Sequence, residues 1–145
     1  MRRKKRTMTL LQRLNEGDRF ARTNGMQLTE VREGYARAEM TVEEKHLNGA
    51  DVCQGGAIFT LADLAFAAVS NCRGILTLGI GNTIDYISSA RLGDHLVAEA
   101  VESVNHPKLP QCVISVKNQD GVLIAMVTGR SYRKKQNFEF DGLQP

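Results

Sequence analysis

The sequence predicts an α+β fold in which a strongly curved antiparallel sheet wraps around one long central helix. Nearly every residue from 57 to 70 is apolar, which favours a helix that is buried on all sides. Residues Tyr35 to Val42 alternate between apolar and polar side chains, as expected of a half-buried strand. Beyond the apolar run the chain reads as strands and turns, so a sheet should pack on the helix.

The elements before the central helix are expected in a simple order. Residues 8–20 read as a short amphipathic helix that ends at Asn24-Gly25. Its inward positions are expected to be Leu10, Leu11, Leu14 and Phe20. A strand over 26–31 and a tight turn at 32–34 then lead into the alternating strand. A polar connection carries the chain to the central helix.

The central helix carries two features that a purely structural helix would not need. It begins at Gly55-Gly56, where bare backbone N–H groups stay open to a ligand. It also places one carboxylate, Asp63, within its apolar surface, where burial is costly unless partners satisfy the charge. Such a residue is a candidate for chemistry, and an Asp bonded to a neighbouring backbone group is the alternative. The helix is shorter than the roughly twenty residues of a membrane span, so no membrane contact is expected.

Four strands are expected after the helix. Their ranges are 76–87, 95–104, 111–118 and 122–128, with a continuation of the last one to 134. Gly79 and Gly81 interrupt the first of them and predict a bulge or a close backbone approach, and Asp120-Gly121 predicts a hairpin. The chain is expected to form one domain over 1–145 with loose tails at 1–7 and 138–145. Six strands cannot enclose the helix, so a second subunit should cover the remainder.

Charge and cysteine content narrow the classes of function. The 145-residue chain has a net charge of +3, and the basic run over residues 1–6 alone carries five positive charges. The rest of the chain is slightly acidic, which argues against nucleic acid as the main partner. Three cysteines without paired spacing predict reduced thiols and a cytoplasmic location. The chain's three histidines lack the spacing of metal ligands and are expected in loops or on strand surfaces, so no metal site is expected.

Three short motifs around the start of the helix resemble the signature of hotdog-fold acyl-CoA thioesterases. They are Asn48-Gly49, Cys53-Gln54-Gly55-Gly56 and Leu61-Ala62-Asp63. The closest likeness is to the PaaI-type group, named for the phenylacetic-acid pathway. The stretches Thr83–Tyr86 and Arg91–Asp94 resemble the strand and the following loop of that family, so the likeness covers roughly 47–133. It implies a hotdog fold and the hydrolysis of an acyl-CoA or aryl-acyl-CoA thioester.

The resemblance also implies catalytic roles for individual residues. Asp63 would be the nucleophile or general base, and the Gly55 N–H would polarise the thioester carbonyl. Asn48 would help to place the carboxylate or the water. Gln54 stands where the family usually has His; it can donate a hydrogen bond but cannot titrate. Gly79 and its neighbours offer no hydroxyl where some members place a Ser or Thr.

Substrate binding and assembly follow from the same likeness. Gly56 is expected to contact the substrate, and coenzyme A is part of that substrate, so no separate cofactor is expected. The candidates for its phosphates are Arg91, Lys108, Arg130 and Arg133, each of which could equally be an ordinary surface charge. Gly55 and Asp63 lie roughly 12 Å apart along one helix. A homodimer with shared active sites is therefore expected, and a tetramer built as a dimer of dimers.

Other readings of the same residues remain open. Cys53 could be a nucleophile, although no His is fixed near it and a small buried thiol is commoner. Hydratases of this fold use a His paired with an acid, and Gln54 removes the obvious His. A non-catalytic acyl-CoA sensor or scaffold is the main alternative to an enzyme. The acyl group, and the choice between direct attack by Asp63 and attack by an activated water, are left open by the sequence.

Overall fold

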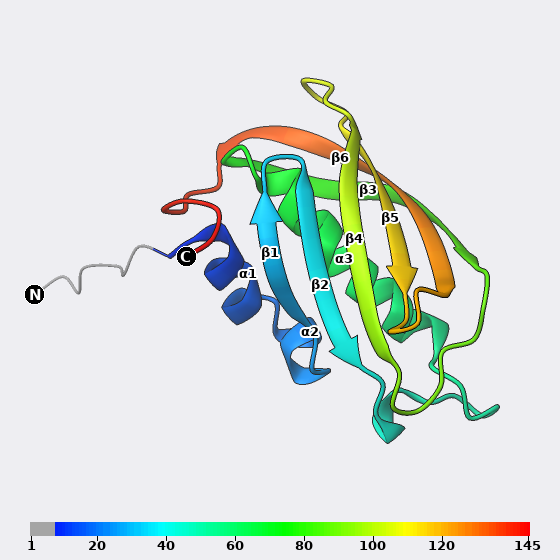
Figure 1. The fold of residues 1–145 in the computed structure, drawn as a ribbon. Coiled ribbons are helices and arrows are strands. Elements are labelled where there is room, and N and C mark those ends of the chain that lie inside the picture. The colour runs from blue at the N-terminus through cyan, green and yellow to red at the C-terminus, as the bar shows by residue number, and fades with distance from the viewer. Residues whose placement is uncertain (1–7) are drawn as a thin grey trace, which may run out of the picture.

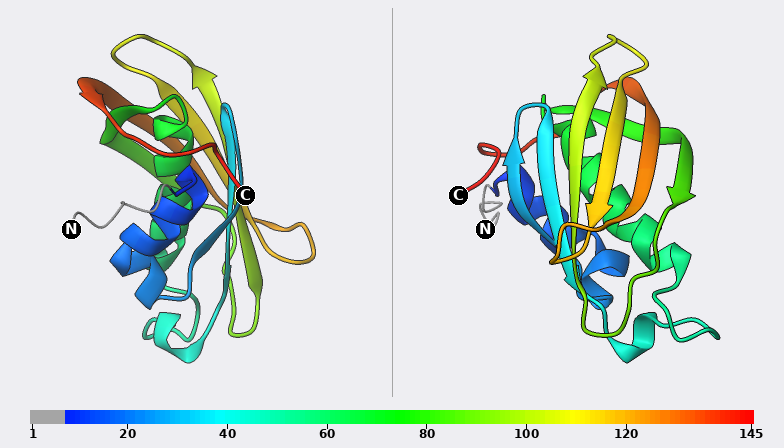
Figure 2. Two further views of the ribbon diagram at one scale, coloured as in Figure 1. Left: turned by 90° about the vertical axis from the view of Figure 1, so that its left-hand side faces the viewer. Right: turned by 45° about the vertical axis from the view of Figure 1, so that its right-hand side comes forward.

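Helix α3 (Gly55–Asn71) lies against the concave side of a curved six-stranded antiparallel sheet (Figures 1 and 2). The computed structural model describes residues 8–145. The expectation of a loose basic tail over 1–7 lies outside the described residues. The predicted α+β architecture, a sheet wrapped around a central helix, is confirmed.

The sheet has the strand order β1-β2-β4-β5-β6-β3. Its strands are β1 (Gln27–Arg32), β2 (Tyr35–Thr41), β3 (Ile75–Tyr86), β4 (His95–Val104), β5 (Gln111–Lys117) and β6 (Leu123–Asn137). The alternation in β2 is confirmed, because Ala36, Ala38 and Met40 are buried on the side that faces α3. The short 3-10 helix η1 (Glu44–His46) lies in the connection between β2 and α3. Strand β6 runs three residues beyond the predicted end at 134.

Helix α3 supplies the centre of the hydrophobic core. Ile58, Leu61, Leu64, Phe66 and Val69 are all at most 3% exposed, and burying a side chain of this size contributes about 1.5–3 kcal/mol. None of the helices in residues 8–145, α3 included, has the length and hydropathy needed to cross a membrane.

The glycines of β3 and β6 allow the sheet to approach α3 closely. A Cβ at Gly79 would lie 3.2 Å from Phe66 Cε1, and one at Gly129 would lie 2.7 Å from Phe66 Cε2. The register of β3 against β6 also shifts between Gly79 and Gly81. Both parts of the prediction for these glycines, the bulge and the close approach, are confirmed.

The N-terminal helix predicted over 8–20 is two helices, α1 (Leu10–Gly17) and α2 (Arg19–Thr23). Asp18 separates them, because its side chain accepts a hydrogen bond from Ala21 N and so caps a new helix. The break changes the helical phase. Leu10 is buried as expected, but Phe20 is 68% exposed, so its predicted inward position is wrong.

The C-terminal segment 138–145 is not the loose tail that the sequence predicted. Leu10 N and Leu11 N donate to the carbonyls of Gly142 and Leu143, each at 3.0 Å. The hydrophobic side chains in this segment that pack against the core are Phe138, Phe140 and Leu143. Apolar burial together with backbone pairing to α1 therefore fixes this end of the chain (Figure 1).

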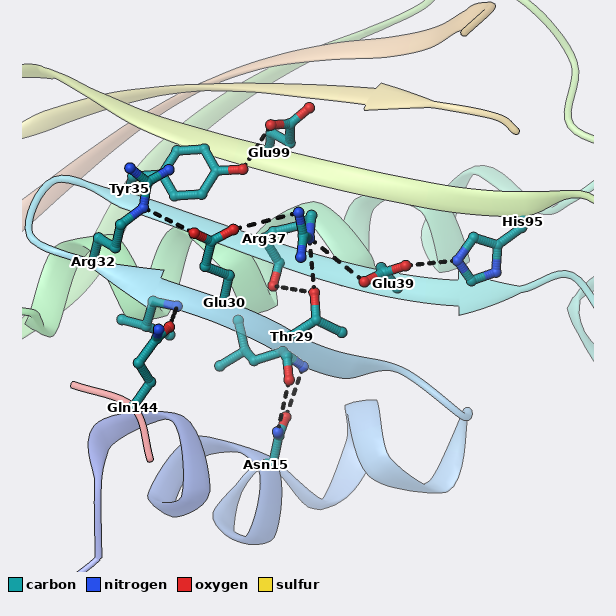
Figure 3. Close-up of polar contacts among 12 residues, drawn as sticks. Asn15, Thr29, Glu30, Arg32, Tyr35, Arg37, Glu39, His95, Glu99 and Gln144 are labelled. Atoms are coloured by element: carbon teal, nitrogen blue, oxygen red, sulfur yellow. Dashed lines mark hydrogen bonds and ion pairs between the residues drawn. The ribbon is translucent and has the colours of Figure 1, made fainter. Parts of the chain in front are cut away.

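The two edges of the sheet differ in how their backbone groups are satisfied. At β1, Leu28 N donates to Asn15 Oδ1 at 2.8 Å and Val31 N donates to Gln144 Oε1 at 2.8 Å (Figure 3). Side chains from α1 and from the C-terminal segment thus cover this edge. At β3, by contrast, Leu78 and Ile80 are 47% and 61% exposed on an edge strand of twelve residues. A long apolar edge of this kind is a template for pairing with another chain.

Candidate active site

The N-terminus of α3 presents one free backbone donor. Gln54 is the N-cap, and its Oε1 accepts a hydrogen bond from Gly56 N at 2.9 Å. Its carbonyl accepts the N–H of Ala57 at 3.0 Å. Among residues 8–145, the Gly55 N–H has no acceptor. Because partial positive charge collects at a helix N-terminus, this N–H suits an oxygen that becomes negative during a reaction.

Tyr86, at the end of β3, packs directly against this donor. Its hydroxyl donates to the Gly55 carbonyl at 2.9 Å, and a Cβ at Gly55 would lie 2.8 Å from Tyr86 Cζ. Partial burial raises the pKa of Tyr86 above its ordinary value, so the hydroxyl stays protonated at neutral pH. Glycine at position 55 is therefore required by the ring beside it as well as by access for a ligand.

Asn48 organises the loop that delivers the chain to α3. Its Oδ1 accepts hydrogen bonds from Ala50 N at 2.9 Å and from Val52 N at 3.3 Å. Leu47 and Cys53 close the loop as an isolated antiparallel bridge. Within one chain the Asn48 side chain thus holds its own turn, and its amide group is exposed to solvent.

Asp63 lies on the side of α3 that faces away from the sheet. It shares that side with Gly56 and Thr60, which precede it by seven and three residues, and it is exposed in the single chain. Six strands leave this side of α3 uncovered in the single chain, as expected, and within one chain Asp63 is not enclosed by an apolar surface. No hydrogen bond or ion pair to the carboxylate occurs within residues 8–145. Crowding by protein atoms, followed by the negative charge of Asp18, raises the pKa of Asp63 above its usual value.

The expected phosphate-binding residues lie apart in the single chain. Arg91 lies in the loop beside the start of α3, because the carbonyl of its neighbour Ala90 accepts Cys53 N at 2.8 Å. Lys108 follows the opposite end of β4, where its carbonyl accepts Arg133 N at 2.8 Å. Arg130 also lies on β6, beside Gly81. One chain therefore places Arg91 on the side of the start of α3, Lys108 and Arg133 at the opposite end of the sheet, and Arg130 near the middle of β6.

A cavity of about 440 Å³ adjoins the first turns of α3. It lies between α2, the η1 segment and α3. Its walls are formed by Phe20, Asn24, Met26, Lys45, His46, Leu47, Gln54, Gly56, Ala57 and Thr60. Its volume falls within the range of small-molecule sites.

His46 fixes one wall of this cavity rather than lying on a surface. It is 3% exposed, its Nδ1 accepts Glu43 N at 2.9 Å, and its Nε2 is 2.8 Å from the Asn24 carbonyl. Because a carbonyl only accepts, Nε2 carries the proton. His46 lies in the connection before α3, as expected, but it is buried there because it ties η1 to the end of α2.

Two rival chemistries receive no support from the geometry. Cys53 is buried, and burial raises the pKa of its thiol to about 11, so it is protonated at neutral pH and a poor nucleophile. In residues 8–145, no group of three or more His, Cys, Asp or Glu side chains is arranged to hold a metal ion.

Sequence reasoning missed Tyr86 and the residues of α2 that wall the cavity. Both sets reach the start of α3 through tertiary packing. Tyr86 ends the stretch Thr83–Tyr86 that resembles the family's strand, but that likeness gave it no role, and no motif marks the α2 residues.

Comparisons with known proteins agree with this geometry. Residues 51–106 match the thioesterase superfamily. A proposed esterase of Archaeoglobus fulgidus is 47% identical over 77% of this chain and 72% of its own length. The acyl-coenzyme A thioesterase PaaI of Escherichia coli is 36% identical over 81% of this chain and 84% of its own length.

Solved structures give the same result. The structure of the E. coli PaaI protein from the phenylacetic acid degradation operon superposes with a TM-score of 0.82 at 30% identity, covering 89% of this chain and 99% of that one. The TT0310 protein of Thermus thermophilus superposes with a TM-score of 0.76 at 30% identity, covering 79% and 97%. The chain therefore belongs to the thioesterase superfamily, within the PaaI-type group of hotdog-fold thioester hydrolases.

Proposed function

We propose that this thioesterase hydrolyses acyl-CoA thioesters, with the Gly55 N–H as the oxyanion donor and Asp63 as the catalytic carboxylate. The observation that carries the proposal is the free N–H at the start of α3, on the same helix as a carboxylate without a partner in residues 8–145. The similarity to PaaI of E. coli, an acyl-coenzyme A thioesterase, supports coenzyme A as the thiol.

The chemistry follows from the charge that develops during hydrolysis. Attack on the thioester carbon moves an electron pair onto the carbonyl oxygen, which the Gly55 N–H and the helix N-terminus stabilise. If Asp63 acts as a base, it takes a proton from water while the water oxygen bonds to the carbonyl carbon. The C–S bond then breaks, and the departing thiolate of coenzyme A takes the proton back from Asp63. If Asp63 attacks directly, its oxygen bonds to the carbonyl carbon, the C–S bond breaks and the thiolate of coenzyme A leaves, which gives a mixed anhydride that water then hydrolyses to the free acid and the Asp63 carboxylate. A raised pKa makes the carboxylate a better base in the first route.

Each active site is proposed to use two chains. Gly55 and Asp63 are eight residues apart, which corresponds to roughly 12 Å along α3, whereas both must reach one carbonyl group. The edge of β1 is covered by Asn15 and Gln144, so the open β3 edge is the natural place for a second copy. Antiparallel pairing of two β3 edges about a two-fold axis sets α3 of one chain beside α3 of the other.

The same pairing gives Lys108 and Arg133 a role that one chain cannot. Within a chain, Thr77 near the start of β3 pairs with Arg133, and Tyr86 at its end lies on Gly55. Antiparallel pairing of two β3 strands sets the start of one beside the end of the other. The Lys108–Arg133 end of one subunit would then lie beside the Gly55 of its partner, where coenzyme A phosphates need cations. A dimer of such dimers would give the expected tetramer.

The proposed function is tested with a panel of aliphatic and aromatic acyl-CoAs, assayed by the release of free thiol. Wild-type protein should turn over at least one of them, and Asp63→Asn should lower kcat by about 10²–10⁴ with its fold retained. Tight binding of acyl-CoA without thiol release would instead favour the sensor or scaffold. Turnover by Asp63→Asn above about a tenth of wild type would remove the carboxylate from the mechanism.

A further inference from the structure

The first turn of α3 starts with two residues that favour a helix weakly. They are Gly55 and Gly56, and a glycine backbone loses more freedom on folding than that of any other residue. An N–H that stabilises an oxyanion must keep its direction, since a donor that points elsewhere for part of the time contributes less to the transition state. Contacts from outside the helix backbone are therefore needed to hold this turn.

Two side chains hold the peptide group between Gly55 and Gly56, one at each end. Gln54 Oε1 accepts the Gly56 N–H at 2.9 Å, and the Tyr86 hydroxyl donates to the Gly55 carbonyl at 2.9 Å. Because a peptide group is planar, contacts at its N–H and at its C=O fix the orientation of the whole plane. The Gly55 N–H belongs to the preceding peptide group, whose Gln54 carbonyl accepts Ala57 N at 3.0 Å. Both planes that meet at Gly55 are therefore held.

Tyr86 is itself held by the sheet. It ends β3, where it pairs with Ala125 of β6, and the N–H of the next residue, Ile87, donates to the Ile124 carbonyl at 2.8 Å. Its ring lies against Gly55, since a Cβ built there would be 2.8 Å from Tyr86 Cζ. The sheet thus sets the position of the hydroxyl, and the ring blocks movement of Gly55 toward it.

We propose that Tyr86 is a positioning residue for thioester hydrolysis, whose hydroxyl fixes the Gly55–Gly56 peptide and through it the direction of the Gly55 N–H. The inference rests on the proposed function and adds to it the residue that orients the oxyanion donor. Tyr86 acts through Gly55 and takes no part in bond making, so its hydroxyl should affect the transition state and hardly affect binding of the ground state. A residue that only packs the end of β3 would affect stability instead.

The test removes one tyrosine hydroxyl at a time. Tyr86→Phe keeps the ring against Gly55, and because Tyr86 is 51% exposed, the substitution leaves the core intact. Tyr35→Phe is the matched control. The Tyr35 hydroxyl also donates one hydrogen bond, to Glu99 at 2.7 Å (Figure 3), but Tyr35 alternates with the buried Ala36 and so lies on the side of the sheet that faces away from α3. Circular dichroism checks that both variants fold.

The kinetic readout is kcat and KM for the acyl-CoA that the wild-type protein hydrolyses fastest in the panel. Tyr86→Phe should lower kcat by about three- to tenfold, the size expected for the loss of one hydrogen bond between neutral groups. KM should stay within about twofold of wild type, because the donor is needed most in the transition state. The fall in kcat is smaller than that expected for removing the donor, since the Gly55 N–H remains and Gln54 still holds one end of the peptide. Tyr35→Phe should change kcat by less than about twofold.

The structural readout is the mobility of the glycine amides in the ligand-free protein. Labelling with 15N-glycine gives signals from the chain's 13 glycines. NMR order parameters of about 0.85 indicate a rigid backbone, and values below about 0.6 indicate a flexible one. Gly55 and Gly56 should be rigid in the wild type and in Tyr35→Phe, and their order parameters should fall toward the flexible range in Tyr86→Phe. Gly129, within β6, should stay rigid in all three proteins.

The two readouts separate this inference from the proposed function. If the wild type hydrolyses no acyl-CoA while Tyr86→Phe raises the mobility of Gly55 and Gly56, the catalytic proposal fails and the support of this peptide by Tyr86 stands. If thioesters are hydrolysed and Tyr86→Phe keeps kcat within about twofold of wild type, or loses kcat while both glycine amides stay rigid, the positioning role is overturned and the catalytic proposal stands. No turnover by the wild type together with rigid glycine amides in Tyr86→Phe overturns both.

Discussion

Removing the Gly55 N–H without disturbing α3 should cost the enzyme about 10²–10³ in kcat. Proline lacks the N–H and is favoured at the first position of a helix. Gln54 has φ −64° and ψ 137°, a conformation that a following proline accepts. The obstacle is Tyr86, whose ring atoms would lie 2.8 Å from any Cβ at position 55. The substitution is therefore made in a Tyr86→Ala background, where the space is free.

The comparison that isolates the donor is Gly55→Pro against Gly55→Ala, both with Tyr86→Ala. The two variants share the missing ring and the added Cβ, and they differ mainly in the N–H. Loss of one oxyanion donor is worth about 2.7–4 kcal/mol in the transition state, which gives the 10²–10³ expected in kcat. Thiol release from an acyl-CoA measures kcat, and circular dichroism checks that the helix is kept. Equal kcat values for two folded variants would refute the role of the Gly55 N–H.

Three further perturbations test the electrostatics and the cap of α3. The pKa of Asp63 is higher in the folded chain than in the unfolded chain. Between the unfolded and the folded pKa, the folded state therefore binds more protons than the unfolded state. As a result, the free energy of unfolding falls as the pH rises through that interval. Asp63→Asn should therefore raise Tm at pH 7 but not below the unfolded pKa of about 3.8, and an unchanged Tm at pH 7 would contradict this. Asp18→Asn keeps an N-cap for α2 and removes the negative charge near Asp63. The pKa of Asp63 should therefore fall, and the acid limb of the pH profile of kcat/KM should move to lower pH. Gln54→His should fold and retain turnover, because a ring nitrogen can accept Gly56 N as Gln54 Oε1 does; loss of the fold would show that the amide has a role of its own.

The architecture was predictable because the hydrophobic periodicity of the sequence indicates most of its helices and strands. The apolar run of α3 and the alternation of β2 are local patterns. The missing side chain of Gly79 likewise indicated that the backbone of β3 approaches another element closely at this position. The break at Asp18 was also local, since an Asp three residues before Ala21 is a capping signal. It was missed because the apolar positions on either side resemble one continuous helix.

The remaining differences come from tertiary packing that no local pattern encodes. Phe138 and Phe140 lie in a segment rich in polar residues, and only contact with the core and α1 orders them. Asp63 is accessible because the sheet covers one side of α3, and a sequence cannot show which side stays open in a single chain. Tyr86 reaches Gly55 from 31 residues away, so a motif search centred on the helix could not find it.

The shared active site is tested most directly by mixing two inactive parents. One parent is Asp63→Asn, and the other combines Gly55→Pro with Tyr86→Ala. A heterodimer of the two has one site with both defects and one with an intact Gly55, Tyr86 and Asp63. Refolded mixtures should therefore regain about half of the wild-type activity per heterodimer, while each parent alone stays nearly inactive. Heterodimers that form but remain inactive, or a monomer that turns over acyl-CoA, would contradict a site built from two chains.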